Sequence, residues 1–178
     1  MYWDVRLLLE TPGTLIALAV IAVIAVPIAR LISRRTVRPW WLVGPAVAAV
    51  GGILGATLGP DGGIQMAKTA CVQNLVDFDG DLAAVFSGGI ADAWPNVILY
   101  VPAGFFVSLV TRRPVLTWLG LVALSACVEF VQPYISRACS SIDWMTNSAG
   151  AFLGVAGAAA TLLARQLATR SKVRVLSE

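Results

Sequence analysis

Five long apolar stretches, separated by short polar segments, dominate the pattern of hydrophobic and polar positions in this chain. Each is close to the roughly 20 mainly apolar residues that an α-helix needs to cross a bilayer. They run from about Pro12 to Ala29, Trp41 to Gly59, Trp94 to Val110, Pro114 to Gln132, and Asp143 to Ala164. The pattern therefore predicts an all-α, polytopic membrane bundle of about five transmembrane helices.

The composition supports a membrane protein. Hydrophobic residues make up 58% of the chain, charged residues 13%, and the mean hydropathy is +0.80. Soluble domains contain about a quarter charged residues. We expect the 178 residues to form a single membrane domain. Because acidic Asp4 and Glu10 precede the first stretch, and no small-residue cleavage site follows it, we expect a retained helix rather than a signal peptide.

Basic residues are unevenly distributed between the connections of the predicted helices. One side holds ten of them, and the other holds Arg6, Lys68 and Arg137. The ten are Arg30, Arg34, Arg35, Arg38, Arg112, Arg113, Arg165, Arg170, Lys172 and Arg174. The positive-inside rule places the N-terminus outside, an extracytoplasmic loop at about 60–93, and a basic tail, 165–178, in the cytoplasm. Topology thus explains the net charge of +3, and we expect no nucleic-acid partner.

Polar side chains gather at one end of the last three predicted helices. They form three pairs with helical spacing: Asn96 and Tyr100, Glu129 and Gln132, and Asp143 and Asn147. Residues three or four apart lie on one face of a helix. Since short connections make these helices neighbours, the sequence predicts a polar site on the extracytoplasmic side.

Small residues and prolines predict how the helices pack and where they begin. Gly51 with Gly55, and Gly150 with Gly154, form small-xxx-small pairs, which allow close helix packing, within one chain or between two copies. We expect packing within the chain. Pro95 and Pro114 are placed in the first turn of the third and fourth helices, Pro133 ends the fourth, and Pro102 kinks the third.

Several short motifs follow one another between Asn74 and Gly157. They are Asn74-Leu75-Val76-Asp77-Phe78; Trp94-Pro95-Asn96-Val97-Ile98-Leu99-Tyr100-Val101-Pro102-Ala103-Gly104; Glu129-Phe130-Val131-Gln132; and Arg137 followed by Asp143 and Asn147-Ser148-Ala149-Gly150. In this order and spacing they resemble the VanZ-like family of membrane proteins, over about residues 74–157.

The resemblance implies a role in the cell envelope. The family's prototype is associated with resistance to the glycopeptide teicoplanin, and its biochemical activity is not established. The implied ligand is a lipid-linked glycan or a lipoglycopeptide at the outer leaflet of the cell membrane, with membrane lipids as partners. The chain departs from the family at Asp77, commonly proline, at Ala103, commonly leucine, and at Ile142, where a second acid often precedes Asp143.

Each polar residue then has a functional and a structural interpretation. In an enzyme, Glu129 and Asp143 are the candidate catalytic acid and base. The candidate ligand-binding residues are Asn96, Tyr100, Gln132, Arg137 and Asn147. The structural alternatives are a Glu129–Arg137 ion pair, a helix cap at Asp143 or Asn96, and a packing role for Tyr100.

Other chemistry has less support in the sequence. No histidine is present, which removes the usual zinc and haem ligand sets, and we expect no cofactor and no metal. Asp77, Asp79 and Asp81 alternate like the start of a calcium loop, but the glycine and the bidentate glutamate of that loop are missing. We expect Ser140 and Ser141 to form a polar turn.

Two further expectations remain open. A non-catalytic scaffold, or a small proton-coupled transporter that uses Glu129, is the alternative to an enzyme or binding protein. Cys71 and Cys139 both fall on the predicted outer side, where disulfides persist. We predict a bridge between them, which intact-mass measurement with and without reductant tests.

Overall fold

The structure is a computed structural model that describes residues 12–58, 90–135 and 139–175. These residues are almost entirely helical, and no strand occurs among them. The elements are α2 (Pro12–Thr36), α3 (Trp40–Leu58), α6 (Ile90–Thr111), α7 (Pro114–Val131), the 3-10 helix η2 (Gln132–Ile135) and α8 (Ser141–Val175). The predicted all-α fold is confirmed.

Four of the described helices are long and apolar enough to cross a membrane. The qualifying segments are Trp40–Leu58, Trp94–Thr111, Pro114–Ile135 and Ser141–Ser171. They correspond to the second to fifth predicted spans. α2 has 25 residues, which is also sufficient length for a bilayer. Side chains in its N-terminal part are only partly described, so the crossing by α2 stays a prediction.

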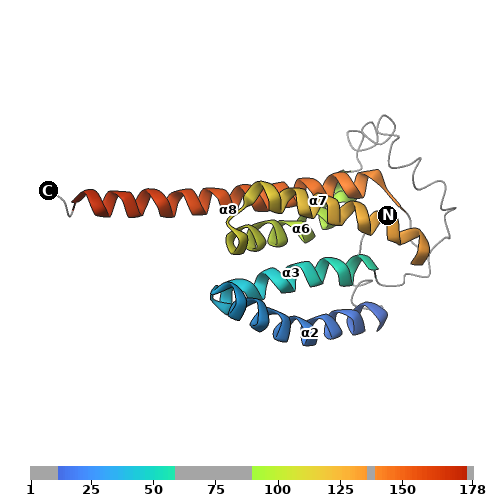
Figure 1. Cartoon of the computed structure of the whole chain (residues 1–178). Helices are drawn as coiled ribbons and strands as arrows, with labels where there is room; N and C mark the ends of the chain where they lie inside the picture. The colour runs from blue at the N-terminus through green and yellow to red at the C-terminus, as the bar shows by residue number, and fades with distance from the viewer. Residues whose placement is uncertain (1–11, 59–89, 136–138, 176–178) are drawn as a thin grey trace.

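The last helix is longer than its apolar stretch. The predicted span ended at Ala164, whereas α8 continues to Val175 and extends beyond the other helices (Figure 1). Neither glycine nor proline occurs between Arg165 and Val175, so nothing in the sequence ends the helix there. The predicted basic tail is therefore largely a continuation of α8.

Left-handed residues end α2 and α6. Val37 has φ 55° and Arg112 has φ 56°, each directly after the last helical residue. This conformation is common one residue beyond a helix C-terminus. Pro114 then occupies the start of α7, as predicted.

The predicted position of Pro95 was wrong. α6 begins at Ile90, so Pro95 lies in the second turn of the helix rather than the first. A proline removes only one backbone hydrogen bond, and the residues before it can remain helical when the rest of the helix is well packed. The cap predicted at Asn96 is excluded for the same reason. Pro102 lies inside α6, as expected.

α6 and α8 make the most extensive helix–helix contact. The two backbones approach closely because glycines on each helix face backbone carbonyl groups of the other helix. A Cβ atom at Gly150 or Gly154 would overlap the carbonyl of Val97 or Val101, and one at Gly104 would overlap that of Ala151. The predicted glycine pair of α8 thus packs within the chain. The other pair lies on α3, where Gly51 meets Ile21 of α2 and Gly55 is buried.

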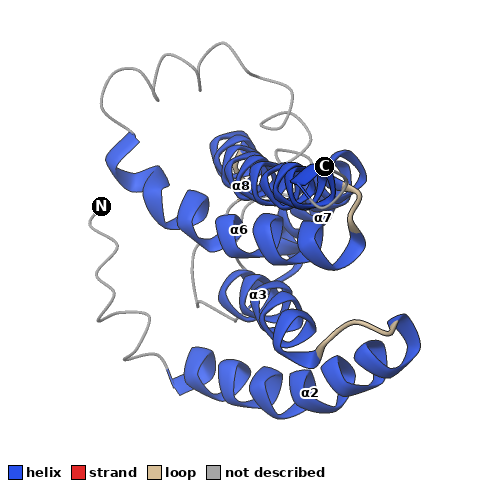
Figure 2. Ribbon diagram, turned by 90° about the vertical axis from the view of Figure 1, so that its left-hand side faces the viewer, coloured by secondary structure: helices blue, strands red, loops and turns tan. Residues whose placement is uncertain are grey.

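The helices are arranged in two groups that α3 connects. Figure 2 shows α3 between α2 and the group formed by α6, α7 and α8, in agreement with the contacts of α3 to both α2 and α6. A buried core cluster consists of Ile53, Tyr100, Ala103, Leu121 and Ala151. Many large apolar side chains outside it are exposed, as expected for helices that face lipid.

Candidate functional site

Glu129 lies at the end of α7 and is almost completely buried, at 1% exposure. Its Oε2 accepts a hydrogen bond of 3.0 Å from the backbone N–H of Ser140, the residue before α8. A buried carboxylate is costly unless it is hydrogen-bonded or paired. This bond offsets part of that cost and joins the end of α7 to the start of α8.

Ser140 also caps α8. Its Oγ accepts a hydrogen bond of 3.2 Å from the backbone N–H of Asp143, three residues later. A serine at this position satisfies one of the N–H groups left free at a helix start. The predicted capping role of Asp143 therefore belongs to Ser140. Asp143 remains in the first turn, where a negative charge interacts favourably with the helix dipole.

The side chain of Asp143 reaches a neighbouring helix. Its Oδ1 accepts a hydrogen bond of 2.7 Å from Nδ2 of Asn96 on α6. Both side chains are partly buried. The contact joins two positions 47 residues apart in the sequence, and it confirms that the polar ends of these two helices meet.

Asn147 faces α7 in the interior of the bundle. It is 2% exposed, and its Nδ2 donates a hydrogen bond of 3.0 Å to Oγ of the fully buried Ser125. Tyr100 is fully buried, and its hydroxyl lies close to Ser125 and Glu129 without a hydrogen-bond partner within the described residues. Tyr100 thus belongs both to the apolar core and to the polar group.

Gln132 points in a different direction. It is 6% exposed, and its Nε2 lies 3.4 Å from the backbone carbonyl of Thr57 at the end of α3, to which it donates a long hydrogen bond. Gln132 and Glu129 were expected to share one helix face. Gln132 keeps α-helical backbone angles, and its N–H bonds the carbonyl of Val128. Residues three apart in an α-helix differ by about 60° around the axis, so the Gln132 side chain reaches α3 while Glu129 bonds the residue before α8.

These residues form what we call the polar cluster: Asn96, Tyr100, Ser125, Glu129, Gln132, Ser140, Asp143 and Asn147. Ser125 was not among the predicted site residues, and Ser140 was expected only to form a polar turn. A serine three residues before an acidic residue at a helix start is a recognisable capping signal. Ser125 had no such signal, because a serine inside an apolar stretch identifies no partner.

Some predicted features lie outside the described residues. Arg137 lies outside them, and with it the predicted Glu129–Arg137 pair. So does the predicted loop at about 60–93 with its three alternating aspartates, except that residues 90–93 begin α6. Cys139 is disulfide-bonded and Cys127 is a free, exposed cysteine. The third cysteine, Cys71, is not among the described residues, so its pairing with Cys139 stays a prediction.

The polar cluster retains some hydrogen-bonding capacity. Two buried atoms of the cluster, Tyr100 Oη and Asn147 Oδ1, and Oγ of the adjacent Ser141 have no hydrogen-bond partner within the described part of the chain. Buried polar atoms are usually satisfied by protein or by water. In the same part of the chain, no three Cys, Asp or Glu residues are grouped so that they could hold a metal ion.

The fold and the polar cluster define a class: a polytopic helical membrane protein with polar side chains concentrated at one end of its last three helices. The VanZ/LLP1 family model matches residues 55–163, which is more than half of the chain. The chain belongs to this family. A comparison of this chain with the curated proteins and with the solved structures found no match.

Proposed function

We propose that the polar cluster recognises or processes a lipid-linked envelope glycan or a lipoglycopeptide at the outer leaflet, and that it contributes to tolerance of glycopeptides such as teicoplanin. One observation carries this proposal. Polar side chains from α6, α7 and α8 converge and form hydrogen bonds at one end of the bundle. Polar and ionisable groups within membrane helices are costly and usually serve a function. Membership of the VanZ/LLP1 family supports an envelope role.

The carboxylates of Glu129 and Asp143 suit different roles in acid–base catalysis. Glu129 is buried and accepts an N–H bond, whereas Asp143 is partly exposed and accepts a bond from Asn96. Carboxylates in different environments can act as acid and base in one reaction. In this proposal Arg137 binds an anionic head group, and Asn96, Gln132 and Asn147 orient the ligand through hydrogen bonds.

Substitutions that remove a charge test the proposal. Glu129→Gln and Asp143→Asn do so with little change of shape, and Arg137→Gln removes the guanidinium and shortens the side chain. We expect each to abolish the contribution to teicoplanin tolerance while the protein is still expressed and inserted. The measurements are antibiotic tolerance in cells and thermal stability of the purified protein in detergent, made on the same variants.

Thr111→Val is a matched control. Thr111 and Thr117 share a hydrogen bond of 3.0 Å near the α6–α7 connection, at the opposite end of these helices. Its loss removes a contact between α6 and α7 without touching the polar cluster, so tolerance should be unchanged. Normal tolerance in all three well-folded charge variants would contradict the proposed site.

A non-catalytic scaffold is the second candidate, and a specific observation favours it. Four hydrogen bonds already hold members of the polar cluster across helices or across the α7–α8 connection: Asn96 to Asp143, Glu129 to Ser140, Gln132 to Thr57, and Asn147 to Ser125. If their role is structural, the charge variants lose stability as well as function. Removing one partner of a buried charge pair costs about 3–5 kcal/mol. A large loss of thermal stability would therefore favour the scaffold.

A further inference from the structure

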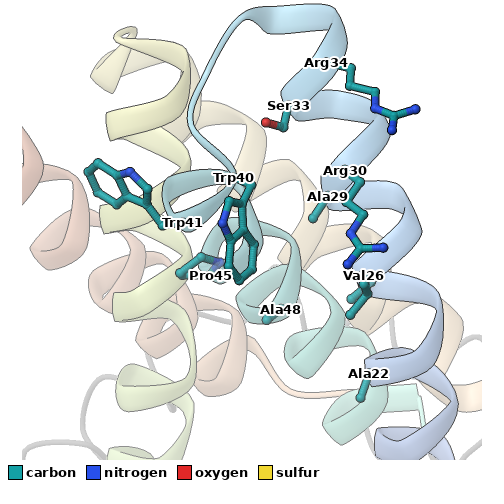
Figure 3. Close-up of a pocket in the computed structure, with 12 residues that line it drawn as sticks. Ala22, Val26, Ala29, Arg30, Ser33, Arg34, Trp40, Trp41, Pro45 and Ala48 are labelled. Atoms are coloured by element: carbon teal, nitrogen blue, oxygen red, sulfur yellow. The ribbon is translucent and has the colours of Figure 1, made fainter.

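A second candidate site lies between α2 and α3, close to the turn that joins them. A cleft of about 1090 Å³ opens there, lined by both helices (Figure 3). Gln132 contacts Thr57, near the last residue of α3, whereas the cleft contains Trp40, its first residue. These positions are 17 residues apart in one helix, or about 26 Å at 1.5 Å per residue. The cleft is therefore at the opposite end of α3 from the polar cluster.

The mouth of the cleft is cationic. Arg30 and Arg34 are four residues apart on α2, so their side chains lie on one face, and both are exposed. Neither makes an ion pair among the described residues, and no acidic residue occurs between Glu10 and Asp61 in the sequence. Two adjacent guanidinium groups without a protein carboxylate suit a phosphate group, which arginine binds through paired N–H donors.

Tryptophan side chains mark the depth of this mouth in the membrane. Trp40 and Trp41 line the cleft and are 66% and 60% exposed. The ring of Trp40 lies over Gly44, where an added Cβ would be 3.6 Å away. Exposed indoles concentrate at the boundary between lipid head groups and acyl chains. The arginines beside them are thus at the level of lipid phosphates.

Below the mouth, the side chains that line the cleft are apolar and mostly small. Small side chains line it, including Ala22 and Val26 on α2 and Ala48 on α3 (Figure 3). These three are exposed to the cleft or its surroundings, although both helices are otherwise packed together. Small side chains leave room along the helices for an acyl chain that descends from the head-group level.

We propose that the α2–α3 cleft binds an anionic glycerophospholipid of the adjacent leaflet. Its phosphate lies between Arg30 and Arg34, and an acyl chain follows the small residues below. Basic clefts between membrane helices on the cytoplasmic side are suited to anionic lipid head groups, and the distribution of basic residues predicts that side for this turn. The site is independent of the polar cluster and of the function proposed for it.

Native mass spectrometry of the full-length protein, titrated with phosphatidylglycerol or with phosphatidylcholine of the same acyl chains, tests the proposal. We expect tighter binding of phosphatidylglycerol. The double variant R30Q/R34Q should weaken it about 25-fold, since one basic residue near the membrane surface contributes about fivefold in affinity. Ala48→Phe, which fills the apolar part of the cleft, should also weaken the binding of phosphatidylglycerol, although Arg30 and Arg34 are both still present.

R112Q/R113Q is the matched control. It removes two adjacent exposed arginines from the connection between α6 and α7, which the same topology places on the same side. Its affinity for phosphatidylglycerol should be unchanged. Equal weakening by both double variants would mean a general effect of surface charge and would overturn the site. Equally tight binding of glycerophosphoglycerol, which has the head group but no acyl chains, would overturn the lipid assignment.

Discussion

Short polar side chains at helix ends decide which helices meet at the polar cluster. Ser140 bonds Glu129 through its backbone N–H and Asp143 through its hydroxyl oxygen, so one residue connects the end of α7 with the first turn of α8. Asn96 then links α6 to the same turn through Asp143. The position of the Asp143 carboxylate therefore depends on the Asn96 amide that bonds it, whatever ligand the site binds.

The Asn96–Asp143 bond gives a prediction at the residue scale. Asn96→Ala should lower the free energy of unfolding by about 1.5–3 kcal/mol, because a hydrogen bond to a charged group is lost. Asn96→Asp should lower it further, because two carboxylates would then meet where an amide now donates at 2.7 Å. Thermal unfolding in detergent at neutral pH measures both.

Ser148→Ala is the control for this prediction. It removes only a bond of 2.7 Å to the Trp144 carbonyl within α8, so its effect should be small. A smaller loss of stability for Asn96→Asp than for Asn96→Ala would show that Asp143 does not carry a charge beside Asn96.

At the scale of elements, glycine determines how closely α6 and α8 approach. Gly104, Gly150 and Gly154 lie where any side chain would overlap a backbone carbonyl of the facing helix. In a bilayer, lipid tails are as apolar as the side chains they replace, so helices associate through close packing rather than through exclusion of water. The polar cluster depends on this contact, because Asn96 is on α6 and Asp143 is on α8.

Alanine substitutions at two glycines of α8 should have different effects on stability. Gly154→Ala should separate α6 from α8, since the new Cβ would meet the Val101 carbonyl, and we expect a loss of at least about 1–3 kcal/mol. Gly157→Ala should be nearly neutral, because its Cβ would be 3.5 Å from the flexible side chain of Phe105. Melting temperatures in the same detergent compare the two. Similar values would contradict the proposed close contact.

At the scale of the whole molecule, charge and hydrophobicity determine how the bundle lies in the membrane. The ten basic residues near the α2–α3 turn, the α6–α7 turn and the end of the chain all fall on the side predicted to be cytoplasmic. The polar cluster is at the other ends of α6, α7 and α8. The proposed outward-facing site depends on this orientation.

Thiol labelling tests the orientation. Cysteine in place of Arg35 or Lys172 should not react with a membrane-impermeant maleimide in intact cells, and it should react after permeabilisation. Cysteine in place of Asp61, on the predicted extracytoplasmic loop, is the positive control and should react in both. External labelling at Arg35 and Lys172 would reverse the topology and place the polar cluster in the cytoplasm.

Much of the fold was predictable because the bilayer acts on local sequence. An apolar stretch must satisfy its backbone hydrogen bonds internally, so a run such as Trp41 to Leu58 becomes a helix whatever its neighbours are. Pro114 begins α7 for an equally local reason. The end of α8 was not predictable from hydropathy, since helical structure continues into polar sequence that contains no helix breaker.

Hydropathy, charge and motif spacing are local properties, so the class, the family and the helices that contain the candidate residues could be predicted from the amino-acid sequence. The hydrogen-bond partners of those residues depend on how the helices pack, and they could not be predicted. Spacing placed Asp143 and Asn147 on one face of α8, but it could not show that one bonds α6 and the other α7. Nor could it show that Gln132 turns toward α3. Such contacts join residues 22 to 75 positions apart, and they depend on helix rotation and on the approach that glycine permits.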